Sequence, residues 1–363
     1  MTILIRFLIK TISIIISATI LLAYLSPYIY PKPYWQFSLL GLGLPWLLLS
    51  VFLLLLLNGA MRHYAVMLWL VAVLLLGLPQ ISAIMQPPKF AATTTHKAIK
   101  VLNYNIFGLS VLKFNNLTEA DFIKFVGEQN ADIACFQEIH NAFDFQTKIK
   151  KAGHFPYMFE QGQLRAIYSK FPIIGGGVID SLCFPEYGKI RLKNFKATGN
   201  GCTYADVLIQ NDTVRVYNLQ LQSNQISTTA NNLRYNGGVK KLKRRQGWAD
   251  IKHMFGLFRH KVQLRAEQAD KVHQHILASK RNVIVCGDFN DTPASYTYHA
   301  MQQGLQDAFR EAGSGLGFTY GGSVPSLRID YILTSDAFDI QHFYIPKVNF
   351  SDHYPVVMSV KLR

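Results

Sequence analysis

The first ninety residues contain no Asp or Glu, and this feature constrains the fold more than any other in the chain. They include only five Lys or Arg residues, and apolar stretches occupy residues 7–25, 37–57 and 64–84. Each stretch is about 20 residues long, the length that a helix needs to cross the roughly 30 Å hydrocarbon layer of a membrane. We therefore expect residues 1–84 to form a membrane anchor of three transmembrane helices.

Other interpretations of the apolar stretches stay open. A single stretch could be a buried core helix, and the first could be a signal peptide because Arg6 and Lys10 form a basic start. No small-x-small cleavage site follows it, which favours an uncleaved helix. Three such stretches in succession favour a membrane anchor over a set of core helices.

The charges that flank the stretches predict an orientation. Positive residues favour the cytoplasmic side, and Arg6, Lys10 and Arg62 outnumber Lys32 on the opposite side. We therefore expect the N-terminus inside, and an odd number of spans then puts the remainder of the chain outside the cytoplasm. Positive residues directly after the third stretch argue weakly for the reverse: Lys89, Lys97 and Lys100.

The rest of the chain has the pattern of a globular domain. A polar, Pro-containing linker is expected at residues 85–97, as is typical between independently folded units, and the domain follows at residues 98–363. Many strands with few helices predict an α+β sandwich rather than a parallel sheet. Strands are expected at residues 98–108, 131–139, 165–174, 203–223, 282–289, 326–333 and 355–362, and helices at 119–130 and about 259–278.

The chain has a net charge of +15, of which +10 lies beyond the first ninety residues. Such a surface attracts polyanions, either nucleic acid or anionic lipid headgroups. The most basic part is residues 224–260, which form either a solvated surface or a contact to phosphates. Five of its positive side chains lie within six positions: Lys240, Lys241, Lys243, Arg244 and Arg245.

The four cysteines include no CxxC pair, which argues against a zinc site. Cys135 and Cys286 lie in apolar runs and are expected to be small core residues. Cys183 and Cys202 could form a disulfide if the domain faces an oxidising compartment.

Polar side chains recur at the ends of the predicted strands. Rigid strand ends can aim such side chains at one shared point. Carboxylate and amide oxygens without a cluster of His or Cys suit a hard cation, Mg²⁺ or alternatively Mn²⁺, rather than zinc. The residues in question are Asn105, Glu138, Asp288, Asn290, Asp330, Asp352 and His353.

The segments YNIFG, QEI, SKFPI, CGDFNDTP, RIDYIL and SDHYPV occur in this order between residues 98 and 363. In this order they resemble the signature of the endonuclease/exonuclease/phosphatase superfamily, which includes deoxyribonucleases, apurinic endonucleases, neutral sphingomyelinases and inositol-polyphosphate phosphatases. The resemblance implies a four-layer α/β/β/α sandwich with its site at one rim of the two sheets. RAEQA, GDFNDTPASYTY and the apolar N-terminal region resemble the membrane-bound bacterial members.

The resemblance implies a metal site and a water-positioning pair. Glu138 would be the principal metal ligand, with Asn105 and Asp352 near the metal directly or through water. Asp288 and Asn290 would position the attacking water and the scissile phosphate.

The resemblance also implies a catalytic histidine. His353 would contact the phosphate or transfer a proton, and Asp330 would accept a hydrogen bond from its other ring nitrogen and fix the tautomer. Either Asp288 or His353 could be the base. Arg265 and Gln268 of the RAEQA segment are expected to be structural.

One position departs from the family pattern. The family stretch N-x-H-L corresponds to Asn218, Leu219, Gln220 and Leu221, so Gln220 stands where the family has histidine. We expect Asn218 and Gln220 to bind substrate. Glutamine can donate a hydrogen bond to a phosphate oxygen, but it cannot carry a positive charge at neutral pH. Activity is therefore expected to be reduced.

These observations predict a membrane-anchored, Mg²⁺-dependent phosphoester hydrolase in a bacterial inner membrane. The most favoured activity is that of a phosphodiesterase that acts on nucleic acid or on a phospholipid headgroup. The lipid bilayer is the other expected partner, and no protein partner is predicted. The alternative is a catalytically degenerate module that binds an anionic ligand, for which Gln220 is the only support.

Overall fold

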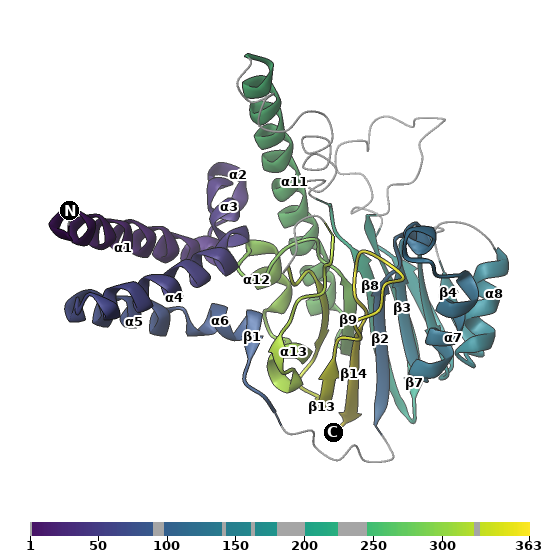
Figure 1. Cartoon of the computed structure of the whole chain (residues 1–363). Coiled ribbons are helices and arrows are strands. Elements are labelled where there is room, and N and C mark those ends of the chain that lie inside the picture. The colour runs from purple at the N-terminus through teal and green to yellow at the C-terminus, as the bar shows by residue number, and fades with distance from the viewer. Residues whose placement is uncertain are drawn as a thin grey trace.

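The computed structural model of the chain shows a β-sandwich from which apolar helices project on one side (Figure 1). It describes residues 2–89, 98–139, 143–160, 164–179, 200–223, 245–322 and 327–363. Cys183, the candidate disulfide partner of Cys202, and the basic residues 240–244 lie outside the described residues.

The N-terminal helices include one that is long and apolar enough to cross a membrane. It runs through α1 (Thr2–Leu25) into η1 (Ser26–Tyr28). The second predicted span is bent by 59° between α3 (Gln36–Leu42) and α4 (Leu44–Ala60), and the third by 67° between α5 (Tyr64–Leu76) and α6 (Leu78–Ile84). The described chain therefore has one candidate span, or three if each bent pair counts as one.

The two bends have a common cause in the sequence. Gly43 and Gly77 lie at the breaks, and Pro45 and Pro79 are the second residues of the helices that follow. Proline has no N–H to donate to the preceding turn, so it is tolerated at a helix start and interrupts a continuous helix.

The sandwich consists of two six-stranded sheets. The first has the order β13-β14-β2-β3-β5-β4 and the second β10-β12-β9-β8-β7-β6. The strands of the first sheet are β2 (Ile99–Asn105), β3 (Ile133–Gln137), β4 (Tyr157–Glu160), β5 (Arg165–Ser169), β13 (Phe338–Tyr344) and β14 (Val356–Leu362). Those of the second are β6 (Ile173–Val178), β7 (Gly201–Ile209), β8 (Asp212–Gln220), β9 (Asn282–Asp288), β10 (Gln306–Asp307) and β12 (Asp330–Thr334).

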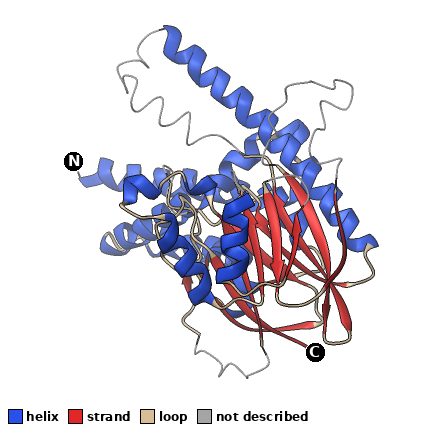
Figure 2. Cartoon of the chain, turned by 90° about the vertical axis from the view of Figure 1, so that its right-hand side faces the viewer, coloured by secondary structure: helices blue, strands red, loops and turns tan. Residues whose placement is uncertain are grey.

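Three apolar cores separate four layers. One core lies between the sheets, a second lies under α7 (Glu119–Gln129) and α8 (Phe143–Ala152), and a third lies under α11 (Arg245–Ala278) and α12 (Tyr296–Gln302). Figure 2 shows the two sheets between these helices. The predicted α+β sandwich is therefore confirmed, with the α/β/β/α layers.

Three predicted elements differ from the structure. The expected strand at residues 203–223 is a hairpin of β7 and β8, which pair antiparallel. The expected strand at residues 165–174 is divided between β5 and β6, which belong to opposite sheets. Pro172 lies between them, where the chain crosses from one sheet to the other and needs no ladder N–H. The expected helix at 259–278 begins earlier, at Arg245, so the end of the basic segment is helical.

The apolar helices pack directly on the sandwich. Met85 and Gln86 form β1, which pairs with β11 (Gly315–Leu316), so the predicted linker begins with a strand. Arg328 is buried and donates from Nη1 to the carbonyl oxygen of Ala83 at 2.7 Å. At Gly41 a Cβ atom would lie only 2.2 Å from the carbonyl oxygen of Ala294. The two parts are therefore in close contact, which the sequence did not predict.

Candidate active site

Strand register brings polar residues of both sheets to one rim of the sandwich. β2 and β3 are parallel and end together, with Asn105 opposite Gln137. In the second sheet β8 and β9 are parallel, and Gln220 lies opposite Asp288. β12 is antiparallel to β9, so Asp330 begins its strand opposite Asp288, rather than ending a strand as the sequence suggested.

Asn105 connects the two sheets at this rim. Its Nδ2 donates to Glu138 Oε1 at 3.1 Å and to Asp288 Oδ2 at 3.0 Å, and its Oδ1 accepts from the Phe107 N–H. Glu138 has a positive φ of 54°, a backbone conformation that is uncommon for Glu and is found where a site requires it. Asn105 therefore orients two carboxylates, and its own oxygen faces the backbone.

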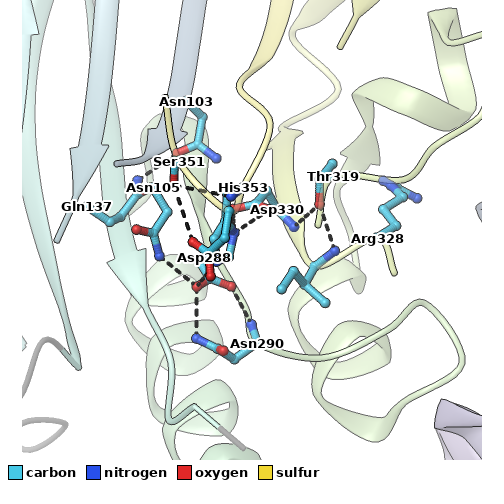
Figure 3. A network of polar contacts seen from close by, with 12 residues as sticks. Asn103, Asn105, Gln137, Asp288, Asn290, Thr319, Arg328, Asp330, Ser351 and His353 are labelled. Carbon is cyan, nitrogen blue, oxygen red and sulfur yellow. Dashed lines mark hydrogen bonds and ion pairs between the residues drawn. The ribbon is translucent and has the colours of Figure 1, made fainter. Parts of the chain in front are cut away.

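Asn290 holds Asp288 in place (Figure 3). The Asn290 backbone N–H donates to Asp288 Oδ1 at 2.8 Å, and its Nδ2 donates to Asp288 Oδ2 at 2.9 Å and to the Leu221 carbonyl. Asp288 is 1% exposed, and burial raises its pKa to about 7. The carboxyl is therefore fixed in position and able to exchange a proton near neutral pH.

His353 and Asp330 form the predicted pair. His353 Nδ1 lies 3.0 Å from Asp330 Oδ2, and its Nε2 lies 3.9 Å from Asp288 Oδ2. Burial lowers the pKa of His353, but the charges of Asp330 and Asp288 outweigh burial and raise this pKa to about 10. The imidazole is therefore cationic at neutral pH and presents Nε2 toward the rim.

The segment before β12 supports this pair. The Thr319 hydroxyl is buried and accepts hydrogen bonds from the backbone N–H groups of Ile329 and Asp330, both at 3.0 Å. The Tyr320 ring lies edge-on to the His353 ring, with centroids 5.1 Å apart. Of the two, only Tyr320 reaches the histidine directly.

Gln220 also reaches the rim. Its Nε2 donates a short hydrogen bond to Glu138 Oε1, while its Oε1 is buried and has no partner among the described residues. Asn218 lies two residues earlier on the same face of β8 and is wholly buried, with Nδ2 donating to the carbonyls of Phe136 and Ala166 and Oδ1 accepting from Gln137. All its polar atoms are occupied inside the sandwich, so Asn218 holds the sheets together here and offers no group to a ligand.

Gln137 and Asn103 were not predicted as site residues, although both belong to this buried network. Gln137 Nε2 donates to Asn103 Oδ1 at 2.6 Å and to Asn218 Oδ1 at 2.7 Å. Strand alternation was the available signal, because Asn103 and Asn105 are two residues apart and must share a face. Arg265 and Gln268 make structural contacts, as expected. Arg265 Nε donates to Asp291 at 2.9 Å, and the Gln268 side-chain oxygen accepts from the Gln222 N–H.

The donor set at the rim fits a hard cation. Asp288, Asp330 and His353 present possible ligand atoms within 4.8 Å of one another, but His353 is cationic and paired with Asp330, and a protonated imidazole does not bind a metal. Glu138 and the half-buried Asp352 remain as oxygen donors, and burial raises the pKa of Asp352. The partnerless oxygen of Gln220 lies beside Glu138. Among the rim residues that the structure describes, the remaining donors are oxygen atoms, which Mg²⁺ or Mn²⁺ prefers.

The two-sheet sandwich, its rim of carboxylates and its paired histidine are those of a phosphoesterase-type hydrolase, the class to which the family match assigns the chain. The chain belongs to the endonuclease/exonuclease/phosphatase family, whose model matches residues 102–353. Members of this family are phosphoester hydrolases and generally use a divalent metal. A second model, described only as a domain of unknown function, matches residues 6–84. No curated protein matches the chain.

Solved structures share the fold. A family protein of Beutenbergia cavernae is 17% identical, with a TM-score of 0.50 over 74% of this chain and 72% of that one. One of Bacteroides thetaiotaomicron is also 17% identical, with a TM-score of 0.50 over 74% of this chain and all of that one. Danio rerio TDP2, complexed with single-strand DNA product, is 15% identical, with a TM-score of 0.50 over 73% and 99%.

Proposed function

We propose that this protein is a membrane-anchored, Mg²⁺-dependent phosphodiesterase. The observation that carries the proposal is the contact of Asn105 with Glu138 and Asp288, which joins one carboxylate from each sheet beside the His353–Asp330 pair. A rim that only bound anions would not need so many carboxylates, because their negative charge repels phosphate.

Glu138 and Asp352 would hold the cation, with Asn105 fixing the direction of Glu138. When bound, the cation would polarise the phosphoryl oxygen and offset negative charge on the leaving oxygen. Gln220 would turn its side-chain oxygen toward the cation or its side-chain NH2 group toward the phosphate.

The remaining rim residues would activate water and stabilise the phosphate. Asp288, held by Asn290 and with a raised pKa, would accept a proton from the attacking water. His353 would donate from Nε2 to a phosphate oxygen, because Asp330 keeps its Nδ1 protonated and the ring cationic. This division of roles assigns the base to Asp288, which the sequence had left open between the two residues.

The substrate would be a phosphodiester, either nucleic acid or a phospholipid. The positive net charge beyond residue 90 suits both, and the TDP2 structure complexed with a DNA product supports nucleic acid. The membrane anchor supports lipid equally well. We keep both as outcomes of one screen.

The proposed anchor includes α1 as a span and the two bent pairs as further spans, with the sandwich outside the cytoplasm. α1 has the length and composition of a membrane-spanning helix, which supports this arrangement. A reporter fused after Arg363 should be active only outside the cytoplasm. Activity inside would contradict this orientation.

The first test is hydrolysis of a chromogenic phosphodiester by the full chain in lipid nanodiscs, with Mg²⁺ or with a chelator. Turnover that requires Mg²⁺ would support the proposal and justify a screen of DNA, RNA and phospholipid. A folded protein without turnover in Mg²⁺ or Mn²⁺ would instead favour the anion-binding alternative, in which Gln220 has replaced a catalytic histidine.

A further inference from the structure

The end of α1 marks where the proposed membrane boundary lies. The apolar helix runs to Tyr28, and α2 (Pro31–Tyr34) begins three residues later. Tyr28 is 60% exposed and Tyr34 59% exposed. Tyrosine and tryptophan concentrate at membrane–water interfaces because one end of the ring system is apolar and the other polar. Residues 28–35 therefore have the composition of an interfacial belt.

The N-terminal half of α11 packs against this belt. The Trp35 ring lies 6.0 Å from the Phe255 ring and 6.2 Å from the Phe258 ring. Gln263 Nε2 donates to the Lys32 carbonyl at 2.7 Å. Figure 1 shows α11 rising beside α2 and α3 and crossing the direction of α1. If α1 spans the membrane, this part of α11 lies along the membrane surface.

The outer face of this part of α11 is basic and aromatic. Lys252, Phe255 and Arg259 are spaced by three and four residues, so they share one face of the helix. All three are exposed, Phe255 at 38%, and no acidic residue occurs from Ile251 to Leu264. An apolar ring between two cations on a helix in the interface plane is the arrangement that binds anionic lipid surfaces.

We propose that the surface formed by Tyr34, Lys252, Phe255 and Arg259, here called the α2–α11 edge, lies in the headgroup layer of an anionic bilayer. Phe255 and Tyr34 enter the boundary of the acyl chains, and Lys252 and Arg259 contact lipid phosphates. This inference rests on the proposed membrane anchor and adds a second, lateral contact to it.

The contact would also fix the active site relative to the lipid. The C-terminal half of α11 contacts the rim through Arg265, whose Nε donates to Asp291, the residue after Asn290. One continuous helix thus joins the α2–α11 edge to the loop that positions Asp288. The rim would be kept close to the headgroups instead of moving freely on a tether.

Lipid quenching of a fluorescent label tests the inference without using activity. The full chain, as Cys183→Ser with Phe255→Cys, is labelled with a polarity-sensitive fluorophore in vesicles of phosphatidylcholine and phosphatidylglycerol. Brominated lipids should reduce its emission to about half, as expected for a side chain at the headgroup–acyl boundary. Leu277→Cys, which is exposed at the other end of α11, should keep its emission.

A label on Ile14→Cys in α1 distinguishes the proposed membrane anchor from the proposed contact of the α2–α11 edge. Quenching at position 14 without quenching at position 255 would leave the anchor in place and overturn the α2–α11 edge. No quenching at either position would overturn the anchor and this inference with it.

Charge reversal tests the chosen lipid. Lys252→Glu with Arg259→Glu should remove most of the quenching at position 255, since each basic residue near an anionic surface contributes about 1 kcal/mol. Lys124→Glu with Lys151→Glu, on the opposite outer layer, makes the same change in charge and should have no effect. Equal quenching in all three proteins would contradict a contact through Lys252 and Arg259.

Discussion

At the scale of single residues, the rim depends on a small number of amides that orient carboxylates. Asn105 reaches carboxylates of both sheets, Asn290 fixes Asp288, and Gln220 donates to Glu138. Each amide satisfies a buried charge without adding one, so the rim keeps its negative potential for a cation. The consequence is that Gln220 competes with any cation for the Glu138 oxygen.

Replacing Gln220 with histidine should restore the family's residue. Gln220→His is expected to raise kcat toward a chromogenic phosphodiester by about 10², because an imidazole can carry a positive charge next to the phosphate. Gln222→His, two residues further along, is the matched control and should not raise kcat. An unchanged or lower kcat for Gln220→His would mean that the site is built around the amide.

Removing the partner of His353 should alter the pH profile as well as the rate. Asp330→Asn is expected to lower kcat by about 10² to 10⁴. The Asp330 charge raises the pKa of His353, so its loss lowers this pKa and the cationic imidazole is lost at lower pH. The alkaline limb of the kcat profile should therefore move to lower pH. A lower rate with an unmoved limb would point to a purely structural role for Asp330.

Most of the rim was predictable from the sequence because its residues lie at or next to the ends of buried strands in recognisable segments. The network of Asn103, Gln137 and Asn218 was not predicted, although strand alternation places Asn218 one row deeper than Gln220. Which row reaches the surface depends on where each strand ends, and the sequence does not fix strand ends to within two residues.

At the scale of elements, the strands with continuous apolar runs were predicted well. β4 and β13 were not predicted, because as edge strands of the first sheet they bury fewer side chains and lack such runs. The bends of the second and third apolar stretches were not predicted either, although Pro45 and Pro79 indicate where a helix can break. Composition identifies an apolar helix but not whether it is continuous.

The contact of α3 with the sandwich gives a sharp test at this scale. Gly41→Ala adds a Cβ atom 2.2 Å from the Ala294 carbonyl oxygen, so α3 or the loop that follows Asn290 must move. We expect the free energy of unfolding to fall by about 1–3 kcal/mol, as at other overpacked positions, and kcat to fall as well. Gly43→Ala, where the nearest atom lies at 3.4 Å, is the matched control. Equal thermal unfolding of both variants would contradict the packing.

At the scale of the whole molecule, the N-terminal helices contact the segments that support the active-site rim. Arg328 lies two residues before Asp330 and bonds both Asp307 and the Ala83 carbonyl. Ile84 accepts from the Gly317 N–H, two residues before Thr319. Both segments that support the His353–Asp330 pair thus contact the end of α6. The sequence could not predict this contact, because it joins residues more than two hundred positions apart.

Deleting residues 1–97 should therefore impair the active site itself. The fragment from residue 98 loses the partner of Arg328 and leaves Ala294 and Phe318 without their apolar neighbours. We expect a lower Tm and a lower kcat toward a small soluble phosphodiester, for which membrane attachment is irrelevant. A fragment with the Tm and kcat of the full chain would show that the helices serve only as a tether.

The most direct measurement is Mn²⁺ binding to the full chain in nanodiscs, monitored by electron paramagnetic resonance, because the proposed hydrolysis depends on a divalent cation held by Glu138. We predict saturable binding that Mg²⁺ displaces, that Glu138→Gln abolishes, and that the exposed control Glu128→Gln leaves unchanged. Binding that Glu138→Gln does not weaken, or no saturable binding to the wild-type protein, would contradict a metal-dependent hydrolase at this rim.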